Sequence, residues 1–270
     1  MKTLVLMYHN VVNSDNGLHL YDVSLDNLKK QMTIIKSPGH QVTKSPGHKV
    51  TRTQSCKDTR TKLYPLNANL RGTRYALRDT ILTFDDGYKS WAQEVLDILN
   101  EAGLKAYFFV CMEFIKNGSI SKEDIVKLKN NGMVIGSHGM KHRFLHKLSN
   151  RELFYELGES KKALEDIIQD EVKHFSIPRG VHNKKILKIA KDLGYKHIFT
   201  SDIGINRKNE FALKRIPIKR DVSLEAFQDI ISGKSIRVMV FSQKIRDKAK
   251  KSLGIGVYNL IRRILVTKAE

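Results

Sequence analysis

Two acidic residues and two histidines are the side chains whose types and spacing could do chemistry in this chain. Asp85 and Asp86 stand side by side at the end of the apolar run 81–84. Adjacent carboxylates destabilise each other unless a cation or a proton separates their roles. Farther along, His138 and His142 are four positions apart. Two imidazoles and one carboxylate form an N,N,O ligand set suited to zinc or a similar divalent ion.

The two acids are expected to divide the work. We assign Asp86 to the metal with both histidines, and Asp85 to the role of general base on water, whose pKa a bound ion lowers. Because neighbouring residues of a strand point to opposite sides, the turn at Gly87 must bring both carboxylates near one ion. Taken alone, the acids could form a plain turn and the histidines a solvated helix face. Their occurrence after strands of one α/β domain favours the metal site.

A third cluster follows the apolar segment 175–177 and ends in a turn restrained by Pro178. The backbone N–H of Arg179 could face a developing oxyanion there, although an ordinary strand-to-helix turn explains the residues equally well. We assign Tyr88, Pro178 and Asp202 to substrate binding. For Asp202, which follows the predicted strand 197–200, a simple turn is the favoured alternative.

The elements that must position these residues alternate along the chain. Strands and helices that follow each other in this way imply parallel strands with right-handed crossovers, in a barrel or a wound sheet. In both architectures ligand sites lie at the carboxyl ends of the strands, where each polar cluster falls. Periodicity predicts strands at 3–7, 81–84, 105–110, 133–137, 175–177 and 197–200, and helices at 25–36, 91–100, 121–131, 150–169 and 184–193.

Charge is concentrated in two segments. The chain has 270 residues and a net charge of +20, of which residues 37–80 and 244–270 supply +13. We therefore predict no specific nucleic-acid partner, because the basic residues belong to an insertion and a tail rather than to a groove. Residues 37–80 contain an eight-residue tandem repeat, 37–44 followed by 45–52, and are predicted to form an irregular insertion.

The two ends of the chain carry predictions about location. Residues 244–270 are predicted to form a basic amphipathic helix, which could lie on an anionic membrane surface or dock on its own domain. The apolar run 3–7 is too short for a signal peptide and is predicted to be a buried strand. With only two cysteines, a reducing cytoplasm is expected, with membrane association as the alternative.

The three clusters resemble the motifs of the polysaccharide deacetylases of carbohydrate esterase family four. Residues 83–87 resemble the first motif, with Asp85 as base and Asp86 as metal ligand, and residues 137–142 resemble the second, which holds the other ligands. Residues 176–180 resemble the third. Two positions depart from the family: Gly139 replaces a residue that usually supplies a supporting hydroxyl, and Arg179 stands where an aromatic residue is common.

The general acid must come from elsewhere. The family's late Leu-x-His motif has no match, since residues 216–220 contain no histidine. Tyr8 and His9 resemble the branch that deacetylates poly-N-acetylglucosamine, in which an early Tyr-His segment supplies the acid. The resemblance therefore implies His9 in this role. His182 is the reserve, and a histidine without chemistry at a strand end is the alternative for His9.

The resemblance covers about residues 3–36 and 81–232 and implies a distorted (β/α) barrel of about seven parallel strands. We expect a deacetylase domain at 1–243, including the insertion, followed by the helix at 244–270. The expected activity is hydrolysis of a carbon–nitrogen, non-peptide bond. The enzyme would remove N-acetyl groups from a polysaccharide, oligosaccharide or saccharide-lipid containing N-acetylglucosamine. Zinc is the expected ion, with cobalt, nickel and manganese as alternatives. An O-acetyl ester hydrolase and a non-catalytic relative that binds anionic polymer or membrane are the competing functions.

Overall fold

The computed structural model describes residues 2–13, 19–36, 41–42, 66–69 and 79–253. The described strands are β1 (Lys2–Tyr8), β2 (Val11–Val12), β3 (Val23–Ser24), β4 (Gln41–Val42), β5 (Leu66–Asn69), β6 (Asp79–Asp86), β7 (Ala106–Val110), β8 (Val134–Ser137), β9 (His174–Ser176), β10 (His197–Phe199), β11 (Asn206–Arg207), β12 (Ala212–Leu213) and β13 (Ile216–Pro217). The described helices are α1 (Leu25–Lys36), α2 (Leu96–Ala102), α3 (Met112–Lys116), α4 (Lys122–Asn130), α5 (Asn150–Phe154), α6 (Ser160–Ile168), α7 (Lys184–Asp192), α8 (Leu224–Ile231) and α9 (Ile236–Leu253), with π-helical turns η1 (Trp91–Val95) and η3 (Tyr155–Glu159) and the 3₁₀ turn η2 (Leu145–Lys147).

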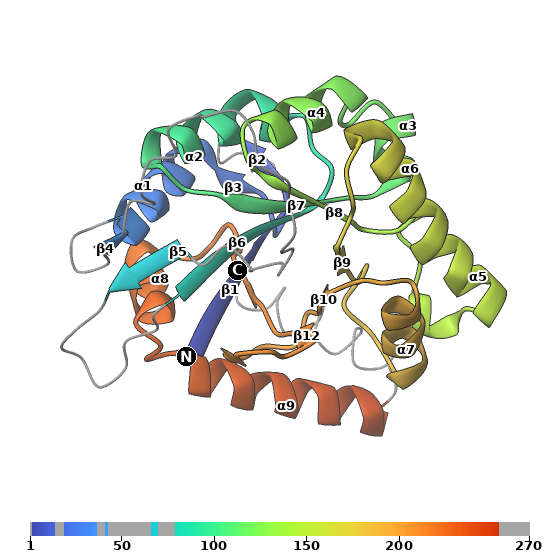
Figure 1. Ribbon diagram of the computed structural model, residues 1–270. Coiled ribbons are helices and arrows are strands. Elements are labelled where there is room, and N and C mark those ends of the chain that lie inside the picture. Colours follow the sequence, from blue (N-terminus) through green and yellow to red (C-terminus); the bar gives the residue numbers. More distant parts are fainter. Residues whose placement is uncertain (1, 14–18, 37–40, 43–65, 70–78, 254–270) are drawn as a thin grey trace.

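The strands form a nearly closed barrel with helices around it (Figure 1). From β1 the order runs β6, β7, β8, β9, β10 and β12, and every neighbouring pair on this path is parallel. β13 pairs in parallel with β1, so the chain from β12 to β13 spans the gap between β10 and β1. The predicted barrel is thus confirmed. Two edge pairings are antiparallel, β11 on β1 and β5 on β6.

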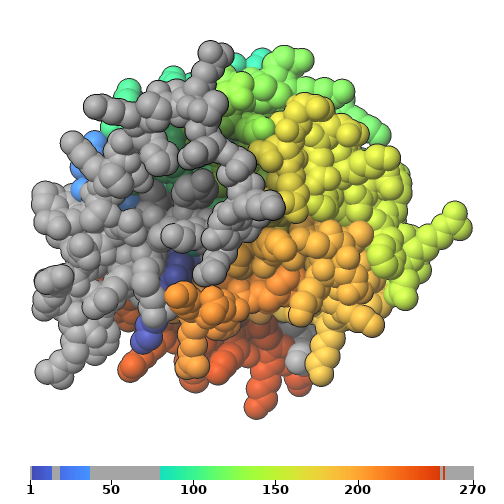
Figure 2. Space-filling view, viewed as in Figure 1, coloured from blue at the N-terminus to red at the C-terminus, as the bar shows by residue number. Residues whose placement is uncertain are grey.

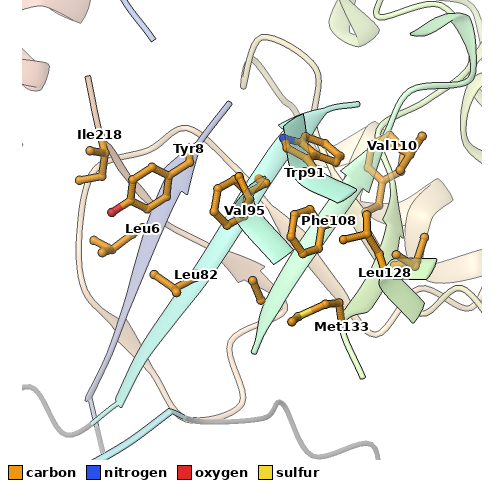
Figure 3. Close-up of a cluster of buried hydrophobic side chains, with 14 of the residues drawn as sticks. Leu6, Tyr8, Leu82, Trp91, Val95, Phe108, Val110, Leu128, Met133 and Ile218 are labelled. Carbon is orange, nitrogen blue, oxygen red and sulfur yellow. The ribbon is translucent and has the colours of Figure 1, made fainter. Parts of the chain in front are cut away.

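Alternation along the strands separates two apolar layers. The outward layer packs against the helices and includes Tyr8, Trp91 and Phe108 (Figure 3). In this layer the Phe84 ring stacks between two others, 5.2 Å from that of Tyr8 and 4.9 Å from that of Phe108. The inward layer contains only strand residues, such as Ile81 and Phe109, and fills the barrel. Because side chains alternate between the faces, Asp85 lies on the same inner face of β6 as Ile81. The barrel interior therefore ends in a carboxylate at its carboxyl end.

Local sequence signals explain several of the helix boundaries. A capping box links Ser149 with Glu152 at the start of α5, and a second one links Ser121 with Asp124 at the start of α4. The single helix predicted at 150–169 consists of α5 and α6 joined by the π-helical turn η3. A π turn contains one extra residue per turn and is often found at functional sites. This turn carries Glu156 toward the barrel, as described below.

The insertion and the tail are described only in part. Within 37–80, the structure describes β4, β5 and the first two residues of β6, so nearly all of the tandem repeat lies outside the described residues. The boundary expected at residue 244 falls inside α9, and residues 254–270 are not among those described. Among the described helices, none has both the length and the apolar character needed to cross a membrane.

Candidate active site

Three predicted metal ligands meet at the carboxyl end of the barrel. Asp86 ends β6, His138 follows β8 directly, and His142 lies in the loop that comes after it. One ligand atom from each lies within 4.8 Å of the others. The Nε2 atoms of His138 and His142 are 3.3 and 3.2 Å from the same oxygen, Oδ1 of Asp86. The structure therefore brings together the residues that the spacing predicted.

The donor set fits a divalent cation. Oδ1 of Asp86 is buried and makes no hydrogen bond within the described part of the chain, despite the two nearby imidazoles. Nδ1 of His138 lies 2.9 Å from the carbonyl oxygen of Ser176. A carbonyl only accepts, so Nδ1 carries the proton and the lone pair of Nε2 faces the carboxylate. Two electron-rich atoms aimed at one another call for a cation between them, and an N,N,O set is one that zinc accepts.

Electrostatics favour the charged form of Asp86. Burial opposes ionisation of this carboxyl group, but the two imidazoles outweigh burial and hold its pKa well below the usual range. The hydroxyl of Tyr88 donates to the other oxygen, Oδ2, over 3.2 Å. Burial, followed by the charge of Asp86, raises the pKa of Tyr88, so the phenol keeps its proton. Tyr88, predicted to bind substrate, therefore also contacts a metal ligand directly.

Backbone conformation sets the site apart from the rest of the barrel. Asp86, His142 and Arg179 have φ angles of 90°, 50° and 60°, and they are three of the five non-glycine residues with positive φ among those described. Such conformations are strained for L residues and gather at functional sites. Gly87 follows with φ 128°, and a Cβ there would lie 3.1 Å from Cγ2 of Ile120. The predicted glycine turn is confirmed.

The second acid, Asp85, has a different set of partners. Its two oxygens accept hydrogen bonds of 2.7 and 2.8 Å from the guanidinium of Arg215, and Ser176 Oγ donates over 3.0 Å. Burial opposes ionisation of Asp85, but the charge and hydrogen bonds of Arg215, together with the charges of His138 and His9, outweigh burial and lower the pKa of this carboxyl. Asp85 is thus a fixed, ionised carboxylate beside the ligand cluster, able to accept a proton.

Sequence reasoning missed Arg215 and Ser176. Arg215 is fully buried in the connection between β12 and β13, and its Nε also donates to the carbonyl of Thr200 over 2.8 Å. The sequence does contain a signal, because Arg215 directly precedes the apolar segment 216–218. A charged residue at the start of a buried strand is rarely left without a partner.

His9 lies just beyond β1 and is partly buried. Its Nδ1 is buried with no hydrogen-bond partner among the described residues, and its ring lies 4.9 Å from that of Tyr21. The indole N–H of Trp91 donates to the His9 carbonyl over 3.0 Å and fixes the backbone there. Burial lowers the pKa of His9, while the charges of Asp85 and Asp86 oppose this change. His9 is thus electrostatically coupled to both acids.

His182, the second candidate for the general acid, lies two residues after the third motif, which ends at Gly180. Its Nε2 is 3.7 Å from Oδ2 of Asp202, and its Nδ1 is 3.2 Å from the carbonyl oxygen of Gly180. Asp202 is largely exposed and follows β10. Asp202 therefore lies at the rim of the site, beyond the carboxyl end of β10. There it contacts His182 rather than the predicted metal ligands.

Pro178 and Arg179 follow β9 and lie beside the metal loop, residues 139–142, which carries His142. Pro178 is buried, and its Cγ lies 3.7 Å from the position that a Cβ on Gly139 would take. The guanidinium of Arg179 lies over the ring of Phe144, 4.5 Å from its centroid. Among the described residues, no backbone or side-chain group accepts a hydrogen bond from the Arg179 backbone N–H. That donor is available for another acceptor.

Comparison with known proteins adds the family. Residues 76–198 match the family model described as polysaccharide deacetylase. YxkH of Bacillus subtilis is 25% identical over 232 residues, which cover 84% of this chain and 75% of that protein. The peptidoglycan-N-acetylmuramic acid deacetylase PdaA of the same organism is 32% identical over 123 residues, 44% of this chain and 45% of PdaA.

The fold has a counterpart among solved structures. The Streptococcus pyogenes deacetylase PplD, solved in complex with acetate, superposes with a TM-score of 0.68 and 22% identity, over 86% of this chain and 98% of PplD. At this identity the likeness concerns the fold. The matched family model and the curated relatives identify residues 76–198 as a polysaccharide deacetylase domain.

Proposed function

We propose that this protein is a metal-dependent N-deacetylase acting on a saccharide that carries N-acetylglucosamine. The observation that carries the proposal is the Asp86–His138–His142 cluster, whose atoms lie within 4.8 Å, beside a second, separately held carboxylate, Asp85. The family relation supports deacetylation. Zinc is the proposed ion, because two imidazoles and one carboxylate match its preferred donors.

The proposed roles follow from the surroundings of each residue. A bound divalent ion would supply Lewis-acid chemistry and lower the pKa of water. Asp85, held ionised by Arg215, accepts the proton of the attacking water. The backbone N–H of Arg179, which has no acceptor among the described residues, donates to the oxyanion that develops on the acetyl carbonyl. His9 protonates the departing amine.

The first experiment measures acetate release from chitooligosaccharides and from poly-N-acetylglucosamine. We expect activity that is lost with a chelator and restored by zinc. Asp85→Asn should lower turnover by about 10²- to 10⁴-fold, since it removes the base but keeps the shape of the side chain. Asp170→Asn, on an exposed carboxylate at the surface, is the matched control and should leave turnover unchanged. Full activity in Asp85→Asn would refute the assigned base.

A second experiment separates the general acid from the base. Amide cleavage needs a proton on the leaving amine, whereas a nitrophenyl acetate releases an anion that needs none. His9→Ala should therefore lower amide turnover by about 10²- to 10⁴-fold and leave ester turnover nearly unchanged. If His182→Ala shows this pattern instead, the acid is His182. A wild-type protein that cleaves only esters would point to O-deacetylation.

We further propose that α9 contacts an anionic membrane surface. Val238, Phe241 and Ile245 are 66%, 64% and 54% exposed, and their spacing places them on one face of the helix. Exposed basic side chains flank this face, including Arg237 and Lys244. An exposed apolar stripe with basic flanks is typical of a helix that lies in a membrane interface. Figure 2 shows α9, in red, along the lower edge of the view with side chains projecting outward.

The opposite face of α9 connects the helix to the site. Gln243 accepts from the backbone N–H of Ile203 over 2.7 Å and donates to the carbonyl of Ser201 over 3.1 Å. These two residues flank Asp202 at the rim. A membrane contact through α9 would therefore hold the rim near the lipid surface, as a lipid-linked saccharide requires.

Vesicle sedimentation tests this contact. The protein should pellet with phosphatidylglycerol-containing vesicles and remain in solution with pure phosphatidylcholine. The double variant Phe241→Ser/Ile245→Ser should lose most of this binding. Phe154→Ser removes another exposed aromatic residue, 46% exposed, from α5 and is the control. Equal pelleting of all three proteins would refute the contact. The cytoplasmic location expected from the sequence stays a prediction, for which cell fractionation is the measurement.

A further inference from the structure

The loop that carries His142 has an unusual set of backbone partners. Three consecutive N–H groups just before it donate to side chains. The N–H of Gly139 donates to Ser137 Oγ over 3.1 Å. The N–H groups of Met140 and Lys141 both donate to one oxygen, Oε2 of Glu156, over 2.8 and 3.1 Å. The backbone leading into His142 is therefore held by side chains rather than by a neighbouring strand.

Glu156 is a buried acidic residue. Its side chain is 0% exposed, and its second oxygen, Oε1, has no hydrogen-bond partner among the described residues. An ionised carboxylate in such a position is unfavourable unless its hydrogen bonds compensate. Within the described residues, the Glu156 side chain accepts two hydrogen bonds, both from the metal loop. Stability of the fold alone gives no reason to keep an acid here, because an apolar residue would fill the space without a buried charge.

The helix is adapted to bring this carboxylate to the loop. Glu156 lies in η3, the π-helical turn between α5 and α6. Ser160 Oγ donates to the carbonyl of Glu156 over 2.6 Å and lies 2.7 Å from Ser137 Oγ, which ties the turn to the end of β8. Ser137 is also the acceptor for Gly139. The π turn, the strand end and the loop thus form one hydrogen-bonded unit.

The glycine at 139 provides the space for this contact. Gly139 has φ 84°, and a Cβ at this position would lie 3.1 Å from Oε2 of Glu156. On the other side, the N–H groups of Met112 and Glu113 donate to the carbonyls of Gly139 and Met140, both over 3.0 Å. The loop is therefore fixed through its donors by Glu156 and through its acceptors by the start of α3. The residue that lacks the family's supporting hydroxyl is the one that admits a carboxylate.

We propose that Glu156 is a positioning residue for the metal site. Its carboxylate fixes the peptide groups of Met140 and Lys141, and so holds His142 in its left-handed conformation, φ 50°, with Nε2 directed at Asp86. The inference rests on the metal site of the proposed function and deepens it. It explains how a loop with two left-handed residues can present a ligand that is already oriented before an ion arrives.

The test measures ion binding rather than turnover. Zinc and cobalt(II) affinities are determined by competition with a chromophoric chelator, and the cobalt spectrum reports ligand geometry. Glu156→Ala should weaken binding roughly 10- to 100-fold, as is typical for loss of a residue that orients a ligand. Glu156→Gln keeps an oxygen acceptor and should stay within about threefold of the wild type, since neutral acceptors still bond two N–H groups. Gly139→Ala should weaken binding about tenfold, since it displaces the same carboxylate.

A matched control separates positioning from general damage. Leu164→Ala removes a buried apolar side chain from α6 and should lower stability without changing ion affinity. Wild-type affinity in Glu156→Ala, or an equal loss of affinity in Leu164→Ala, would overturn the proposal. If Glu156→Ala does not fold, the comparison of Glu156→Gln with Gly139→Ala decides.

Amide hydrogen exchange in the metal-free protein gives an independent measurement. Exchange at Met140 and Lys141 should accelerate at least tenfold in Glu156→Ala and not in Leu164→Ala; unchanged exchange would refute the contact itself. A wild-type protein that binds no ion would contradict the proposed function, while the exchange data would still judge the role of Glu156 in the loop.

Discussion

The two ends of the barrel interior both bury histidines, in opposite surroundings. At the carboxyl end, His138 and His142 face the carboxylate of Asp86. At the amino end, His174 and His197, the first residues of β9 and β10, stack with ring centroids 5.3 Å apart. The ring of Tyr107 meets His174 edge-on at 5.2 Å.

Charge distinguishes the two ends. Burial, together with the charges of His197 and Lys173, lowers the pKa of His174 to about 3. Burial also lowers the pKa of His197. Because no carboxylate among the described residues opposes this change, both imidazoles favour the neutral form, His174 in the core and His197 partly buried. Burial of histidines is thus not enough to make a site, and what matters is the acid that they face.

The largest expected difference between the two ends is in activity. His138→Ala should remove a proposed metal ligand. Acetate release should then fall by about a thousandfold or more, because a bound ion acting as a Lewis acid lowers the activation barrier by several kcal/mol. His174→Phe, which keeps an aromatic ring beside Tyr107, should stay within about threefold, since rates change little when no reacting group is touched. Acetate release from the same substrate measures both. A comparable loss in His174→Phe would show that the amino end takes part in the chemistry.

The next effect concerns the free energy of unfolding. Arg215→Met leaves Asp85 as a buried charge without its partner and should destabilise the protein by about 3–5 kcal/mol. The double variant Asp85→Asn/Arg215→Met should recover most of this loss, because no buried charge remains. Urea unfolding of the wild type, both single variants and the double variant gives the coupling energy. Additive losses would mean that the two side chains do not stabilise each other.

His174, at the amino end of the barrel, should affect how the free energy of unfolding depends on pH. The pKa of His174 is lower in the folded chain, about 3, than the value of about 6.5 expected when it is unfolded. The unfolded chain therefore binds the extra proton, so the free energy of unfolding is fully retained above pH 6.5 and falls as the pH drops from 6.5 toward 3.

His174→Phe should flatten this slope by about one proton, because the titrating group is removed. The measurement is denaturant unfolding of wild type and variant at several pH values between 4.5 and 7.5, so that the carboxylates common to both proteins cancel in the comparison. Identical slopes in wild type and variant would exclude the neutral buried imidazole.

The smallest expected effect is a change in ion affinity at the carboxyl end of the barrel. Tyr88→Phe removes the 3.2 Å hydrogen bond to Asp86 and should weaken ion binding by about 2- to 10-fold, the value of one hydrogen bond. Tyr155→Phe, an exposed tyrosine in η3, is the control and should leave ion affinity unchanged. If Tyr88→Phe alters only the KM for substrate, its role is the substrate contact that the sequence suggested.

The parts of the fold and site that were predictable depend on local patterns. Apolar runs and alternation indicated most barrel strands, and the ligands could be found because Asp86, His138 and His142 each follow such a strand closely. Helix caps such as Ser149 are also local signals. A parallel barrel then brings the strand ends together without any further information.

The parts that escaped prediction depend on contacts between distant residues. Arg215 reaches Asp85 across 130 positions, and neither residue's neighbours in sequence announce the other. Glu156 falls on the apolar side of its helix, in step with Leu153 and Ser160, which in hindsight marks it as a buried acid. The π turn that directs it could not be read from helical periodicity, because periodicity assumes a regular helix.

The closure of the barrel between β12 and β13 has a consequence for the timing of synthesis. The metal ligands lie at positions 86, 138 and 142, so they emerge from the ribosome well before Arg215. With translation at about 5–20 residues per second, the 130 positions from Asp85 to Arg215 take roughly 7–26 s. For the last 73 of these positions, from His142 to Arg215, the nascent chain has all three proposed ion ligands but no guanidinium partner for Asp85. The residue that pairs with Asp85 is thus among the last of the barrel to be made, and a chain that ends before Arg215 leaves this buried carboxylate without its guanidinium partner.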